Sequence, residues 1–239
     1  MLASIAREAG RQYRRRPLAA VATVTVSVAS LALQWTPQAV QVVGALVLLV
    51  AGVLLELFLI AYLAAALQPG SQPAGPALAA ARRSVWPGMR GALLQLGYVA
   101  VAYLVAVLLL GGRDVATLTG RQQTAFWVGL TPLLAIAFAF LAVLSQRIVL
   151  DGERRARLAA AASHRVAGAH FPICLAIGLP QALGWVLGNF QIALVGQAAI
   201  ALGFGLVDPF RIALSNSLFL ATRSLHAAQP GRRDPDRLG

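Results

Sequence analysis

The sequence predicts an all-α, polytopic membrane protein with six transmembrane helices. The first observation is composition: hydrophobic residues make up 59% of the 239 residues and charged residues only 12%, with a mean hydropathy of +0.73. The second is a series of apolar runs that approach or exceed about 18 residues, since roughly 20 helical residues cross a hydrocarbon core about 30 Å thick. The third is the placement of the arginines.

All twenty basic residues are arginines, and alternate connections carry them. Five precede the first apolar run, three follow the second, five follow the fourth and four follow the last. The other connections hold only Arg113 and Arg121, and Arg211 lies inside a run. Because short basic loops resist translocation, this asymmetry predicts a bacterial inner-membrane protein with both termini in the cytoplasm.

Residues 1–17 are predicted to form an amphipathic helix that lies in the inner headgroup layer. Apolar side chains recur at helical spacing on one face, and arginines occupy the other. Pro17 then marks the entry into the first span, because proline is favoured at an early helical position. The apolar face holds Leu2, Ile5, Ala6, Ala9 and Tyr13, and the basic face holds Arg7, Arg11, Arg14 and Arg15.

The first two spans are predicted at 18–34 and 40–67. The first is rich in small and hydroxylated residues such as Thr23 and Ser27, which allow close helix approach in lipid and favour a central position. An uncharged turn at 34–38 joins the two spans. The second span is long enough to tilt or protrude.

Spans three, four and five are predicted at 92–111, 125–146 and 171–187. Amphipathic cytoplasmic segments precede spans one, three and five, and the second and third of these segments lie at 68–91 and 151–169. Glutamine, proline, glycine and serine open the second segment and indicate a turn there.

The last apolar run, about 190–222, is too long for one straight helix perpendicular to the membrane. Asp208-Pro209 interrupts it, and proline usually kinks a helix because it lacks a backbone donor. We expect one tilted, kinked sixth span, so that the transmembrane domain covers 18–222 and a basic, flexible cytoplasmic tail covers 223–239. The alternative, two spans divided at Pro209, would place that tail outside.

Three charged residues fall at similar depth inside the predicted spans: Glu56 in the second, and Asp208 and Arg211 in the sixth. A charged group near the bilayer centre costs at least about 2.5–3.5 kcal/mol, so such residues are candidates for function. A Glu56–Arg211 pair, or an Asp208–Arg211 pair at i,i+3, would reduce this cost. The cluster is either a proton or substrate relay in an internal cavity, or a structural group that only joins two helices. In the structural alternative it is a buried ion pair or contains a neutral, protonated Glu56.

The sequence contains no GxSxG, HExxH, P-loop or dinucleotide-binding motif, so the main routes to an enzyme lack their nucleophile, metal or phosphate cradle. The single Cys174 excludes an internal disulfide and a cysteine-based metal cluster. His164 and His170 have no further ligands at helical spacing and are predicted to be interfacial. We therefore expect a protein that is not an enzyme and binds no metal or cofactor.

The net charge of +12 would suggest nucleic-acid binding in a soluble protein, but these arginines adjoin apolar segments. Anionic lipid headgroups are the expected partner, at about 1 kcal/mol per arginine near the surface, and nucleic acid is not. The arginines expected to contact headgroups or a partner are Arg14, Arg15, Arg16, Arg82, Arg83, Arg154, Arg155 and Arg157.

Two segments carry a resemblance to a known family. Residues 147–152 (RIVLDG), followed by an Ala-rich helix with Arg165 and Gly168, are similar to the basic segment after span four in the six-span membrane domain of bacterial glycerophosphoryl diester phosphodiesterases and its stand-alone relatives. Residues 218–223 (LFLATR) resemble the end of that domain, although its usual Tyr and Asp are absent, and Asp151 replaces Glu. The resemblance implies no catalytic residues, because the phosphodiesterase active site lies in a separate soluble domain.

A second resemblance is to the cytoplasmic coupling loop of ATP-driven importers. It covers 161–180, with Gly168 and the run Ile177-Gly178-Leu179-Pro180, although the acidic residue before the alanines is missing. We expect an accessory or scaffold subunit that contacts lipid and another membrane protein or a second copy. The alternative is a permease subunit that works with a cytoplasmic ATPase. A tightly packed interior would favour the scaffold.

Overall fold

The computed structural model describes residues 2–33, 36–67, 74–109, 118, 120–187 and 194–227, and among them it contains no strand. The predicted outer turn falls partly outside these residues, and the loop after span three and the tail beyond 227 fall outside them. The helices are α1 (Leu2–Arg15), α2 (Leu18–Leu33), α3 (Gln38–Ala64), the 3-10 turn η1 (Ala65–Leu67), α4 (Ala74–Leu109), α5 (Arg121–Phe140), α6 (Leu144–Leu150), α7 (Ala156–Leu187) and α8 (Leu194–Ala227).

Five helical stretches have the length and apolarity of a membrane span. They are Val43–Ala64, Ala74–Leu109, Arg121–Leu150, Ala156–Leu187 and Gln197–Arg223. The 16-residue helix α2 meets α1 at a bend of 82°, and these two together would make a sixth. The protein is therefore an all-α, polytopic membrane protein, as its composition predicts.

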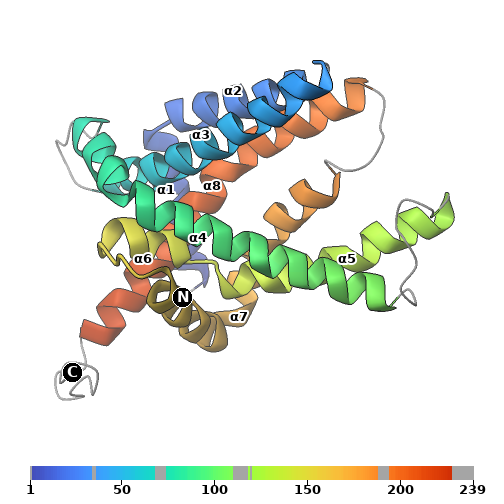
Figure 1. The fold of residues 1–239 in the computed structure, drawn as a ribbon. Coiled ribbons are helices and arrows are strands. Elements are labelled where there is room, and N and C mark those ends of the chain that lie inside the picture. Colours follow the sequence, from blue (N-terminus) through green and yellow to red (C-terminus); the bar gives the residue numbers. More distant parts are fainter. Residues whose placement is uncertain are drawn as a thin grey trace.

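The helices form two bundles that meet near the N- and C-terminal side of the molecule. Helix α2 packs along α8 beside α3 in one bundle, and α5 packs along α7 beside α4 in the other. Figure 1 shows α2, α3 and α8 running together along the top and α4 with α5 extending away below them. In Figure 1, α1, η1, α6 and the end of α8 gather on one side. We call this side the arginine-rich end, because α1, the first turns of α4, the connection from α6 to α7 and the end of α8 contain Arg14, Arg82, Arg154 and Arg223.

The basic segments before spans three and five are not separate elements, in contrast to the prediction. Helix α4 continues through Pro87 although the proline removes one backbone hydrogen bond, because packing holds the helix on both sides of it. Before the proline, Ala81 and Ser84 are buried; after it, Gly88 lies against Leu57 of α3 and Gly91 against Ile148 of α6. Helix α7 likewise joins the basic segment to the span, with a kink at His170 (φ −135°, ψ 37°).

The predicted fourth span is broken instead. Helix α5 ends at Phe140, a turn covers 141–143, and α6 begins at Leu144. Ser163 of α7 accepts a hydrogen bond from the Val143 N–H at 3.2 Å, which supplies a partner for a backbone donor released at the break. Helix α8, by contrast, continues through Pro209 as one helix, in agreement with the single sixth span.

Helix α1 packs its apolar face on protein. Ile5 and Ala9 are buried, and the buried Gln12 donates from Nε2 to the Ser217 hydroxyl of α8 at 3.0 Å. Asn216, the next residue along α8, donates to the Ile60 carbonyl of α3 at 3.0 Å. These bonds fix α1, α3 and α8 together at the arginine-rich end, so α1 is part of the bundle and not only a surface helix.

Candidate functional site: an intramembrane cleft

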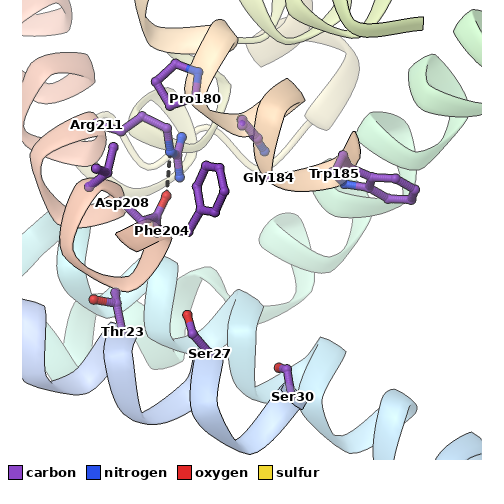
Figure 2. A pocket seen from close by; sticks show the side chains of 11 residues that line it. Thr23, Ser27, Ser30, Pro180, Gly184, Trp185, Phe204, Asp208 and Arg211 are labelled. Carbon is purple, nitrogen blue, oxygen red and sulfur yellow. Dashed lines mark hydrogen bonds and ion pairs between the residues drawn. The ribbon is translucent and has the colours of Figure 1, made fainter. Parts of the chain in front are cut away.

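A cleft of about 720 Å³ lies between α2, α7 and α8, inside the apolar part of the molecule. Figure 2 shows α2 along one side of it, with residues of α7 and α8 facing α2. Because α7 belongs to one bundle and α2 and α8 to the other, the cleft separates the two bundles. Its lining residues are Thr23, Ser27 and Ser30 from α2, Pro180, Gln181, Gly184 and Trp185 from α7, and Phe204, Val207, Asp208 and Arg211 from α8.

The three charged residues identified in the sequence meet at this cleft. Arg211 Nε donates to Asp208 Oδ1 at 2.6 Å, and Arg211 Nη2 lies 3.8 Å from Glu56 Oε1. Asp208 and Arg211 share a face of α8 because they are three residues apart, and Glu56 reaches Arg211 from α3. One guanidinium is therefore paired with two carboxylates, which reduces the cost of each charge in the membrane.

The members of this cluster differ in how far they face the cleft. Asp208 and Arg211 line it, whereas Glu56 is not among the lining residues. The Asp208 side chain is 41% exposed, the Arg211 side chain only 10%. Asp208 is thus the charged group most available to anything that enters. The ion pair and the cavity, which the sequence offered as alternatives, occur together.

Hydroxyl groups follow the α2 wall of the cleft. Thr23, Ser27 and Ser30 are spaced i, i+4, i+7, so they lie on one face of the helix, as Figure 2 shows. The Thr23 hydroxyl donates to the Gly205 carbonyl of α8, and the Ser30 hydroxyl donates to the Val26 carbonyl at 2.9 Å. Because each hydroxyl oxygen keeps its lone pairs after donating, this wall can accept hydrogen bonds from a guest.

A smaller hollow of about 240 Å³ continues the cleft away from the arginine-rich end. It shares Ser27, Ser30, Gly184 and Phe204 with the larger one and extends to Leu187, near the end of α7. Gln197, one of the first residues of α8, also lines it. The polar space therefore runs from Asp208, deep in the spans, toward the end of the molecule opposite the arginines.

Two of the arginines predicted to contact headgroups make contacts within the chain. Arg15 Nη1 donates to the Ala66 carbonyl of η1 at 2.8 Å, and the Arg16 guanidinium lies 5.1 Å from the centre of the Tyr62 ring. The others have exposed side chains at the arginine-rich end and are not brought into the cleft. They are Arg14, Arg82, Arg83, Arg154, Arg155 and Arg157.

The sequence did not single out the α7 part of the cleft. Gln181 and Gly184 are weak signals on their own, and Thr23 and Ser27 were interpreted only as close-packing residues. The histidines lie elsewhere: the Tyr98 hydroxyl and His164 Nε2 are 2.8 Å apart, and His170 is at the α7 kink. Within the described ranges, no three His, Cys, Asp or Glu residues gather as metal ligands would.

No protein-family model, no curated protein and no solved structure matches this chain. The similarity to the membrane domain of the phosphodiesterases therefore stays a prediction from a few segments.

Proposed function

We propose that this chain is a non-enzymatic, multi-pass protein of the bacterial inner membrane that acts as a transport subunit and holds its ligand in the cleft. The cleft is the observation that carries the proposal. The cleft has a volume of about 720 Å³ and exposes charged side chains at membrane depth, where contact with lipid costs free energy. A protein that only joins other proteins together does not need such a cleft. Concave sites of this size are typical of small-molecule binding.

The orientation follows from the arginines. Exposed side chains such as Arg14, Arg82, Arg83 and Arg154 lie at one end, and the positive-inside tendency assigns that end and both termini to the cytoplasm. The deep end of the cleft, at Asp208, then lies toward the cytoplasm, and the end near Gln197 toward the outside.

The exposed arginines at this end also indicate which partners we propose. The exposed arginines at the cytoplasmic end would attract anionic lipid headgroups, and a cytoplasmic ATPase that drives transport would dock at the same end. Arg82 and Arg83 of α4 and Arg157 of α7 are exposed there and suited to either partner. Co-purification from native membranes would identify the ATPase.

An accessory or scaffold subunit is the second candidate, and the outer face of α4 favours it. Val101, Leu104 and Leu108 recur at helical spacing on this helix and are all more than half exposed. Such a face can pack against another membrane protein or a second copy as well as against lipid. Under this candidate the cleft would be filled by lipid chains and would carry no ligand.

Thiol labelling distinguishes the two candidates. In a Cys174→Ala background, Ser27→Cys places a thiol in the cleft. The matched control Val28→Cys places one at the neighbouring position, which is 44% exposed and does not line the cleft. Only a hydrated thiol ionises and reacts readily with a membrane-impermeant reagent. We expect such a reagent, added outside intact cells, to label Ser27→Cys and not Val28→Cys. Equal, negligible labelling of both would contradict the transport proposal and favour the scaffold.

A further inference from the structure

One positive and two negative side chains meet at the deep end of the cleft. Arg211 is paired with both Asp208 and Glu56, so one positive group faces two carboxylates. Among the described residues that line the cleft, Asp208 and Arg211 are the only charged ones. With both carboxylates ionised the local charge is −1, and in surroundings of low dielectric constant a guest of positive charge would be favoured.

The exposure of the two charged side chains that line the cleft also favours a positively charged guest. The Asp208 side chain is 41% exposed and the Arg211 side chain 10%, so an entering group meets the carboxylate first. An anion would have to approach a guanidinium whose Nε already donates to Asp208 at 2.6 Å and whose Nη2 lies 3.8 Å from Glu56. The geometry therefore disfavours a phosphate or carboxylate ligand.

The walls also suit a cation with apolar substituents. Phe204 brings an aromatic ring to the cleft, which Trp185 also lines, and the negative face of such a ring attracts a positive charge within about 6 Å. Ser27 and Ser30 add hydroxyl oxygens that can accept hydrogen bonds. The volume of about 720 Å³ is far more than a bare metal ion fills and lies within the range of about 300–1,000 Å³ of sites for organic molecules.

We propose that the cleft binds an amphipathic organic cation, with its positive centre beside Asp208 and its apolar groups against Phe204 and Trp185. This assignment rests on the proposed transport function and names the chemical class of its ligand. A molecule with an ammonium group and an aromatic or aliphatic substituent is the simplest ligand that fits the carboxylate, the aromatic lining and the volume of the cleft.

Two probes of nearly the same shape and opposite charge test the class of ligand. The full chain is placed in lipid nanodiscs, and saturable binding of tetraphenylphosphonium and of tetraphenylborate is measured after subtraction of empty nanodiscs. We expect saturable binding of the cation alone. Asp208→Asn should weaken it by about tenfold or more, because a carboxylate partly screened by water is replaced by a neutral amide. Asp208→Glu should retain most of it.

Two further variants separate binding from folding. Asp151→Asn removes a carboxylate that pairs with Arg147 at 2.7 Å outside the cleft, and it should leave binding of the cation unchanged. Ser27→Leu narrows the cleft with an aliphatic side chain and leaves all three charges in place, and it should weaken binding strongly even where Asp208→Asn proves unstable. Thermal unfolding of each variant shows which of them are folded.

Three outcomes would overturn the proposal: saturable binding of tetraphenylborate instead, cation binding that survives both Asp208→Asn and Ser27→Leu, or no saturable binding of either probe. If the last result accompanies labelling of Ser27→Cys, the cleft and the transport function stand and only the cationic class is wrong. If Ser27→Cys also fails to react, the transport function falls with it.

Discussion

Helix α7 has two sides that differ sharply in how closely they are packed. On the side facing α5, a Cβ atom added to Gly178 would lie 2.6 Å from the Ala135 carbonyl oxygen and 2.8 Å from the Ala139 nitrogen, so the two backbones are in contact. On the side facing α2 and α8, the nearest atoms to a Cβ atom at Gly184 would be those of the Phe204 ring across the cleft, at 3.4 Å or more. Small residues thus permit close packing in one place and leave an open, polar space in the other.

The charges explain why the second side stays open. Asp208 and Arg211 present groups that lipid and aliphatic side chains solvate poorly, and the Thr23, Ser27 and Ser30 hydroxyls face them from α2. Opposite Gly178, by contrast, is the backbone of α5 at the buried Ala135, Phe138 and Ala139. Polar side chains whose hydrogen bonds are formed within their own helix, or with one neighbouring helix, need no further partner. Space can therefore remain beside them.

The largest expected effect is that of removing the cation from the charged end of the cleft. Arg211→Leu leaves Asp208 and Glu56 without their shared partner, and we expect it to lower the free energy of unfolding by about 3 kcal/mol. Denaturation in mixed micelles measures this change. A variant that unfolds like the parent would contradict the ion pair.

Alanine substitutions at the two glycines of α7 test the difference between its sides directly. Gly178→Ala forces a Cβ atom into the α5 backbone, so we expect a loss of about 1–3 kcal/mol. Gly184→Ala meets only ordinary contact and gains helix propensity, so its stability should stay within about 0.5 kcal/mol of the parent or rise. Equal losses in both variants would mean that the cleft side is as tightly packed as the α5 side.

A smaller contrast is expected along α2. Thr23→Val removes the hydrogen bond to the Gly205 carbonyl at the tight α2–α8 contact and should cost about 1 kcal/mol. Ser27→Ala, one turn further on in the cleft, removes a hydroxyl that faces open space and should change the unfolding free energy by less than about 0.5 kcal/mol. The same denaturation assay compares the two variants. A larger loss for Ser27→Ala than for Thr23→Val would contradict the position of the cleft.

The smallest effect is expected at Glu56. Its Oε1 is 3.8 Å from Arg211 Nη2, whereas Asp208 holds Arg211 Nε at 2.6 Å, so Glu56→Gln leaves the closer ion pair intact. We expect a change below about 0.5 kcal/mol. A loss as large as that of Arg211→Leu would show that Glu56, not Asp208, is the main partner of the guanidinium.

The sequence predicted the fold class and the charged cluster because both depend on local properties. Hydropathy alone identifies long apolar helices, and their alternating direction places Glu56, Asp208 and Arg211 at similar depth before any contact is known. Helix boundaries were less predictable. Packing against α3 and α6 carries α4 through Pro87, and the turn at 141–143 contains none of the glycine or proline that usually marks a break.

The cleft could not be predicted, because its existence depends on which helices meet. The serines and threonine of α2 fit a tight helix contact and a polar wall equally well. Thr23 in fact does both, since it is buried against Gly205 and also lines the cleft. Gly178 and Gly184 are likewise indistinguishable in the sequence, and only their neighbours on α5 and α8 separate their roles.

We expect water to enter the cleft on one face of α2, while lipid covers the neighbouring exposed face. Spin labels at Ser27 and at Val28, in the full chain reconstituted in liposomes, test it through their relaxation by a water-soluble nickel chelate and by oxygen, which concentrates in lipid. The cleft predicts that the chelate dominates at Ser27 and oxygen at Val28. Oxygen dominating equally at both positions would contradict the existence of a hydrated cleft.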